Sequence, residues 1–68
     1  MNENKQSIAD ALVYAVRQTR AGEDVTAIEI TSDGGYAIIR YNNGAKKLVN
    51  IDSDSGIAMI ADVCRALM

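Results

Sequence analysis

The residues of this chain with chemical potential are a single cysteine, several closely spaced aspartates and a basic hairpin. The sequence has no histidine, so Cys64 has neither an imidazole base nor a second ligand for a zinc site. At helical spacing Cys64 falls among apolar residues, which favours a buried structural thiol over a nucleophile. We therefore expect no enzyme activity, no catalytic residues, no metal site and no cofactor.

The stretch from Asp52 to Gly56 resembles the opening of a calcium-binding EF-hand loop. Such a loop needs a bidentate glutamate at its twelfth position, and that position here is Val63. Because Asp and Ser are preferred N-cap residues, capping of a final helix is the expected role of this stretch. The glycine-containing stretches 32–35 and 42–44 lack the lysine and length of a phosphate-binding loop, and we expect hairpin turns there.

Arg40, Lys46 and Lys47 gather on one expected hairpin, close to Tyr36 and Tyr41. Basic and aromatic side chains together can hold nucleic acid. The formal charge of −2, from nine acidic and seven basic residues, favours a solvated strand edge protected by lysines instead. Nucleic-acid binding through phosphate contacts of Arg40, Lys46 and Lys47 is the alternative function.

Size and composition indicate one domain, residues 1–68, that needs a second buried surface. A core of this size rarely supplies more than about 3–5 kcal/mol. The single cysteine excludes an internal disulfide, while 49% of the residues are apolar. Self-association or binding to a partner protein is therefore expected to supply the missing burial.

The N-terminal stretch 1–6 is polar and is expected to be a tail or a helix start, without the apolar run of a signal peptide. No apolar run approaches the roughly 20 residues that span a bilayer. A lone cysteine is typical of a reducing compartment. We expect a cytoplasmic protein with no membrane contact.

Periodicity predicts five elements around this chemistry. Apolar residues recur at helical spacing from Ser7 to Ala21, where Asn2 or Asn4 offers an earlier start, Arg17 and Arg20 fall in the last turn, and Gly22 ends the helix. The remaining elements are strands over 25–31, 35–41 and 45–51 and a helix over 56–67. In that helix Ile57, Ile60, Cys64 and Leu67 share a face, which Met59, Val63 and Met68 broaden. The expected fold is α+β in two layers: a helix, a three-stranded antiparallel meander and a helix (αβββα), with both helices on one face of the sheet.

The second sheet face would then be left uncovered. A two-residue turn at Asp33-Gly34 places Tyr36, Ile38, Arg40 and Glu29 on that face. A two-residue turn at Asn43-Gly44 adds Val49 and Ile51 to it, whereas a three-residue turn with a bulge at Gly44 sends them to the helix side.

These observations predict a small, non-enzymatic protein-interaction module that acts by binding and self-associates as a homodimer or higher homo-oligomer. An apolar patch around Tyr36 and Ile38 is the expected second interface. The candidate partner-binding residues are Tyr36, Ile38, Arg40, Lys46, Lys47 and Tyr14.

The order helix–strand–strand–strand–helix resembles the double-stranded-RNA-binding domain over the whole chain, and Arg65-Ala66-Leu67 is similar to the end of that domain's second helix. The resemblance implies the fold and an RNA-binding alternative. The lysine-rich start of that helix corresponds here to the acidic stretch 52–56, so no RNA-contacting residue is carried over. In size, acidity and element order the chain also resembles small phage-encoded inhibitors of host defence, including some anti-CRISPR proteins, which implies a host protein as partner.

Overall fold

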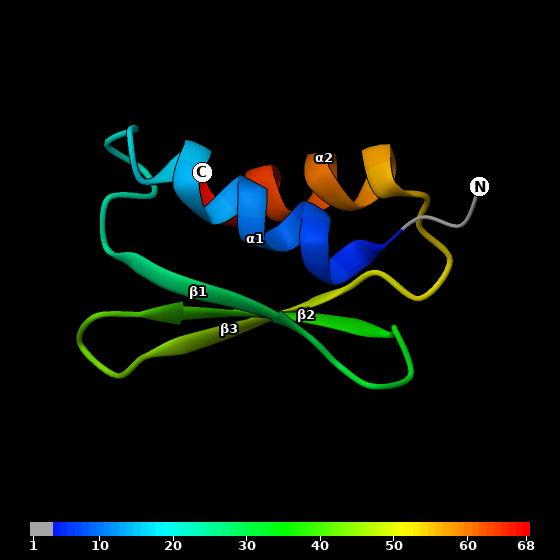
Figure 1. Cartoon of the computed structure of the whole chain (residues 1–68). Helices are drawn as coiled ribbons and strands as arrows, with labels where there is room; N and C mark the ends of the chain where they lie inside the picture. Colours follow the sequence, from blue (N-terminus) through cyan, green and yellow to red (C-terminus); the bar gives the residue numbers. More distant parts are fainter. Residues whose placement is uncertain (1–3) are drawn as a thin grey trace.

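The structure is a computed structural model that describes residues 4–68. Its elements are α1 (Lys5–Val16), β1 (Val25–Ile30), β2 (Tyr36–Tyr41), β3 (Lys46–Asn50) and α2 (Gly56–Leu67). The strands form one antiparallel sheet in the order β1-β2-β3. Both helices lie on the same side of this sheet, and no element covers the other side among the described residues (Figure 1). The predicted αβββα fold is confirmed.

Helix α1 begins at an asparagine cap. The side chain of Asn4 accepts a hydrogen bond of 3.0 Å from the backbone N–H of Ser7, which satisfies one of the free amides of the first turn. The helix therefore starts at Lys5, two residues before the predicted Ser7. This is the earlier start that was expected if Asn4 were the cap. Residues 1–3 of the expected polar tail, with the alternative cap Asn2, lie outside the described residues.

The predicted C-terminal end of this helix, Ala21, is wrong, because α1 ends at Val16. The hydroxyl of Thr19 donates to the Val16 carbonyl at 2.6 Å and accepts from the N–H of Gly22 at 3.1 Å, which turns the chain back. Gly22 packs so closely that a Cβ on it would lie 2.5 Å from the Val16 oxygen. Residues 17–20, including both arginines expected in the last turn, follow the helix instead.

The first hairpin has the predicted register. Ile30 lies opposite Ala37 and Glu29 opposite Ile38. The predicted two-residue turn at Asp33-Gly34 is wrong, because the N–H of Gly34 donates to the Thr31 carbonyl at 2.8 Å and the turn is centred on residues 32 and 33. Gly34 follows this turn with a positive φ of 74°. A bulge between Val25 and Ala27 shifts the register at the far end of β1, so that Val25 joins the buried side.

The second hairpin takes the bulged alternative. A three-residue loop over 42–44 ends on Gly44 with φ of 88°, and Ile38 lies opposite Leu48. This register places Val49 and Ile51 on the helix side, where Ile51 is fully buried.

The core lies between the sheet and the two helices. It is made of small and medium-sized apolar residues from both layers: Ala9, Val16, Val25, Ile28, Ala37, Ile39, Ile51, Met59 and Val63. The prediction for α2 is right in its bounds and partly wrong in its buried face, whose centre lies at Met59 and Val63 rather than at Ile57 and Cys64. Met59 and Val63 point into the core, whereas Ile57 is 78% exposed and Cys64 is half-buried.

Candidate functional site

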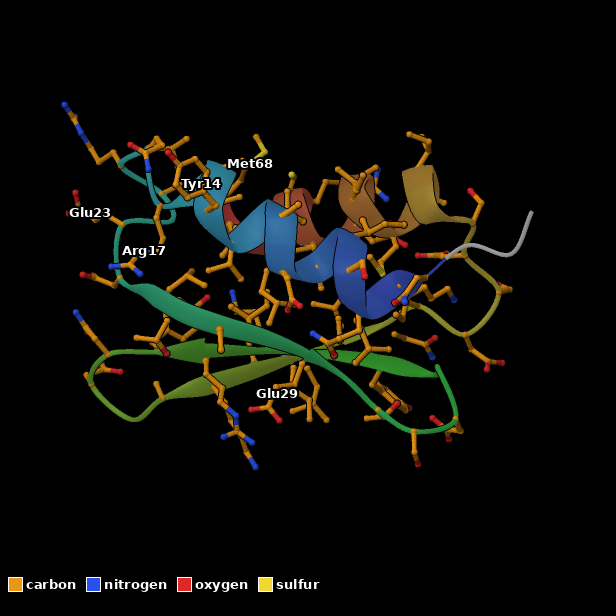
Figure 2. All side chains as sticks on the ribbon, viewed as in Figure 1. Tyr14, Arg17, Glu23, Glu29 and Met68 are labelled. Carbon is orange, nitrogen blue, oxygen red and sulfur yellow. The ribbon has the colours of Figure 1, made fainter. Side chains whose placement is uncertain are left out.

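The side of the sheet that faces away from the helices, here called the outer face, carries a small apolar patch. The residues of the outer face come from all three strands: Ala27, Glu29, Tyr36, Ile38, Arg40, Lys46, Leu48 and Asn50. The apolar patch on this face is made of Tyr36, Ile38 and Leu48. Tyr36 is 42% exposed and Leu48 is 55% exposed, with the half-buried Ile38 between them on the central strand. Figure 2 shows Glu29 projecting from this side, away from both helices. Among residues 4–68, no element covers the outer face.

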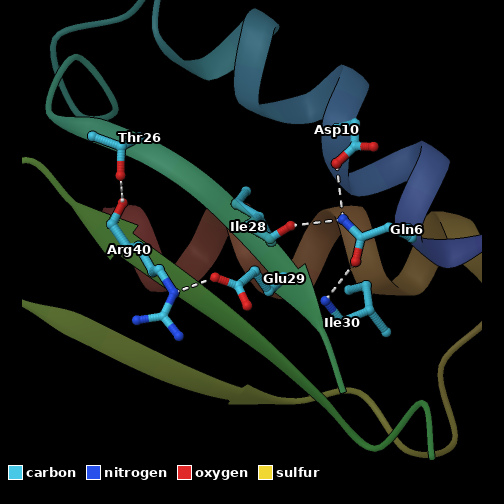
Figure 3. Close-up of polar contacts among 7 residues, drawn as sticks. All are labelled: Gln6, Asp10, Thr26, Ile28, Glu29, Ile30 and Arg40. Atoms are coloured by element: carbon cyan, nitrogen blue, oxygen red, sulfur yellow. Dashed lines mark hydrogen bonds and ion pairs between the residues drawn. The ribbon is translucent and has the colours of Figure 1, made fainter. Parts of the chain in front are cut away.

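Polar groups border the patch on two sides. Arg40 forms an ion pair with Glu29 of the neighbouring strand, and Thr26 donates to the Arg40 carbonyl at 3.3 Å (Figure 3). Lys46 lies directly opposite Arg40 on the other neighbouring strand. No ion-pair partner for Lys46 occurs within residues 4–68. Because the Glu29–Arg40 pair is neutral as a unit, Lys46 gives this face one unpaired positive charge.

The structure brings four of the six predicted partner-binding residues together and separates the other two. Tyr36, Ile38, Arg40 and Lys46 share the outer face. Lys47 points to the helix side, where its ammonium donates to the carbonyl of Ala66 at 2.7 Å. Tyr14 lies on α1, 76% exposed, on the side of the molecule opposite to Glu29 (Figure 2).

Leu48 is the patch residue that the sequence analysis did not single out. Its place depends on the register of the second hairpin, since a shift of one residue would exchange it with Val49. The glycine at position 44 was the available signal for this register, because a type I turn followed by a glycine with positive φ is typical of three-residue hairpin loops with a bulge.

The sequence analysis also did not single out Gln6, which lies in the first turn of α1. Its side-chain amide donates to the carbonyl of Ile28 at 3.0 Å and accepts from the N–H of Ile30 at 2.9 Å. Its Nε2 also donates to Asp10 at 2.8 Å, which fixes the amide orientation (Figure 3). Gln6 thus occupies the free edge of β1 as a neighbouring strand would.

The acidic stretch before α2 serves the helix. Ser55 is the N-cap and accepts from the N–H of Ala58 at 3.2 Å. The Asp54 carboxyl contacts that of Asp62, and a hydrogen bond between them raises the pKa of Asp54 and lowers the pKa of Asp62. Asp62 also pairs with Arg65 one turn later. These interactions connect Asp54, which precedes α2, with Asp62 and Arg65 in the second half of the helix.

An open apolar cleft of about 240 Å³ lies where the C-terminal ends of the two helices meet. Half-buried Cys64 lines it together with Val16, Thr19, Ala21, Leu67 and Met68. Polar atoms contribute almost nothing to its walls. The cleft offers no group that would orient a polar ligand.

Two further observations concern the part of the chain from residue 4 onward. No three His, Cys, Asp or Glu side chains there are grouped closely enough to hold a metal ion. Neither α1 nor α2 has the length and apolar character that crossing a bilayer demands. Comparison of the chain with models of protein families, with curated proteins and with solved structures finds no match.

Proposed function

We propose that this protein is a small, non-enzymatic protein-interaction module that binds a partner protein through its outer face and works as a homodimer. The observation that carries the proposal is the apolar patch of Tyr36, Ile38 and Leu48 on a sheet whose two helices both lie on the other side. Removing such a patch from water is favourable in proportion to its area. A domain of 68 residues has little other apolar burial on which to rely.

The chemistry of the face defines the partner. An apolar centre fits an apolar surface, and the ammonium of Lys46 fits a carboxylate at its border. The partner is therefore a protein with an exposed apolar patch and an acidic residue beside it. Small size, acidity and the αβββα order, which resemble those of phage-encoded inhibitors of host defence, favour a host protein as that partner.

The area of the face favours the dimer. Three strands about 4.8 Å apart and about 20 Å long have a footprint of about 300 Å². A standard interface buries roughly 800 Å² on each partner. The joint footprint of two copies with adjoining outer faces is closer to that area than the footprint of one copy.

The alternative of RNA or DNA binding has less support. It requires Arg40, Lys46 and Lys47 to act as one basic surface. Arg40 is paired with Glu29 and Lys47 is bound to α2, so within the described residues Lys46 alone presents an unpaired charge on the outer face.

The test uses Ile38→Glu, which places a charge in the centre of the outer face, and Ile57→Glu as the matched control on α2. Proteins captured from a candidate host are identified with the wild type, purified and titrated against both variants by calorimetry. We expect Ile38→Glu to weaken binding at least tenfold and Ile57→Glu to leave it unchanged.

Equal binding by the two variants would show that the partner uses another surface. Micromolar, salt-sensitive binding of duplex RNA by the wild type would replace the protein-binding proposal with the nucleic-acid alternative.

A further inference from the structure

The two edges of the sheet differ in how their backbone groups are satisfied. On β1, the outward-pointing carbonyl of Ile28 and N–H of Ile30 are both bound by the side chain of Gln6. A strand approaching this edge would have to displace Gln6 and the first turn of α1 (Figure 3). The edge of β1 is therefore closed to a further strand.

The edge of β3 has no such cover. Just before β3, the carbonyl of Ala45 accepts from the N–H of Tyr41 in β2, and just after β3, the N–H of Ile51 donates to the carbonyl of Gly35. Since backbone groups alternate along an antiparallel ladder, the N–H and C=O groups of Lys46, Leu48 and Asn50 point away from β2. No backbone partner for these outward groups occurs in the described part of the chain.

We infer that two copies of this protein pair antiparallel along their β3 edges, with Leu48 on the two-fold axis, to form one continuous six-stranded sheet. Leu48 then lies opposite Leu48 of the second copy, and Lys46 lies opposite Asn50. In this register every outward backbone group of β3 finds a partner. The inference rests on the homodimer of the proposed function and assigns the surface that forms it.

The side chains of β3 select this register. A pairing centred on Lys46 or Lys47 would set two lysines directly opposite each other, which is destabilising. Registers displaced toward Asn50 would leave Lys46 beyond the end of the opposing strand and lose backbone bonds. With Leu48 at the centre, apolar meets apolar, and the two copies of Lys46 are about 13 Å apart, beyond the screening length at physiological salt.

The pairing also explains how the outer face reaches a useful size. Both copies present their outer faces on the same side of the joined sheet, because neighbouring strands share the sense of their faces. The footprint doubles to about 600 Å², with the two Leu48 side chains at its centre. On the opposite side, each Lys47 lies across from Val49 of the second copy, where its aliphatic stem can pack.

The first experiment measures mass by light scattering from micromolar to millimolar concentration. Leu48→Pro removes the outward N–H at the centre of the edge without removing a bond to β2, since that N–H does not take part in the ladder. Leu48→Thr is the matched control that keeps the N–H. We expect a dimeric wild type and at least a hundredfold weaker dimer for Leu48→Pro than for Leu48→Thr.

The second experiment does not depend on the folding of the proline variant. In a Cys64→Ala background, a cysteine is placed at position 48 or 46 and the protein is oxidised. Directly opposed Cα atoms lie about 5.5 Å apart, within disulfide range. Leu48→Cys should therefore crosslink into dimers, and Lys46→Cys, at about 13 Å, should not.

Ile38→Glu separates this inference from the proposed function, because it changes the outer face and leaves the β3 edge intact. A dimer that survives Ile38→Glu and is lost in Leu48→Pro supports the edge pairing, whatever partner the outer face binds. A dimer lost in Ile38→Glu and retained in Leu48→Pro would overturn it and move self-association to the outer face. A monomeric wild type at millimolar concentration, or equal crosslinking at positions 46 and 48, would also overturn it.

Discussion

Substitution of Gln6 by alanine should destabilise the protein far more than its exposed position on a helix suggests. Alanine removes both the bond to the Ile28 carbonyl, 3.0 Å long, and the bond from the Ile30 N–H, 2.9 Å long. A hydrogen bond contributes about 0.5–1.5 kcal/mol net. Because this edge is partly exposed, we expect a total loss near the lower end, about 1–2 kcal/mol. For a domain of this size that corresponds to a fall in Tm of about 5–15 °C.

A second substitution tests the geometry of the amide. Gln6→Glu keeps an acceptor for the N–H of Ile30, but it sets a carboxylate against the carbonyl of Ile28 and the carboxylate of Asp10. Protonation of the introduced carboxylate removes this repulsion and gives the side chain an O–H that can donate to the Ile28 carbonyl. The difference in Tm between Gln6→Glu and the wild type should therefore narrow as the pH falls through about 4, near the ordinary pKa of a glutamate.

Thermal melts followed by circular dichroism measure both effects. Gln18→Ala is the matched control, because Gln18 makes one longer bond, 3.3 Å, to the carbonyl of Tyr14. In Gln6→Ala the amide of Ile30 should also exchange with solvent faster, since it loses its acceptor. A Gln6→Ala protein that melts together with Gln18→Ala, with unchanged exchange at Ile30, would refute the assignment of Gln6 as the cover of the β1 edge.

Three further predictions concern stability. Gly22→Ala should cost about 1–3 kcal/mol, because the new Cβ would lie 2.5 Å from the carbonyl oxygen of the last residue of α1; chemical denaturation measures the loss, and an unchanged midpoint would contradict the close packing. The hydrogen bond from Thr31 lowers the pKa of Asp33, so the stabilisation by its charged form is complete above the ordinary pKa of 3.8 and is lost as the pH falls through the lower folded value; acid melts of Asp33→Asn should show less of this pH dependence than the wild type. The hydrogen bond with Asp62 raises the pKa of Asp54, so the stabilisation by its protonated form is complete below 3.8 and is lost as the pH rises through the raised value; Asp54→Asn, neutral at every pH, should raise the Tm at neutral pH and change it little in acid.

The sequence alone determined the elements and their order. The helical spacing over 56–67 and the candidate capping residues before it predicted α2 with its observed bounds, and the expected Asp33-Gly34 turn predicted the register of the first hairpin. These features depend on contacts between residues close in the chain, where propensity, capping and turn geometry act directly. The apolar centre of the outer face, Tyr36 and Ile38, followed from the same local alternation.

Tertiary structure alone decided the features that depend on distant contacts. The sequence left two registers open for β3, and a difference of one residue determines whether Leu48 or Val49 lies on the outer face and sends Lys47 to the helix side. Helix α1 continues to Ala21 by periodicity, yet it ends at Val16 because the chain after it folds back against that residue. Gln6 appears in the sequence only as a polar residue near the N-terminus. Its role at the edge of β1 arises because packing brings α1 onto that strand, so that Gln6 contacts residues 22 and 24 positions further along the chain. The pattern of neighbouring residues does not indicate contacts at such separations.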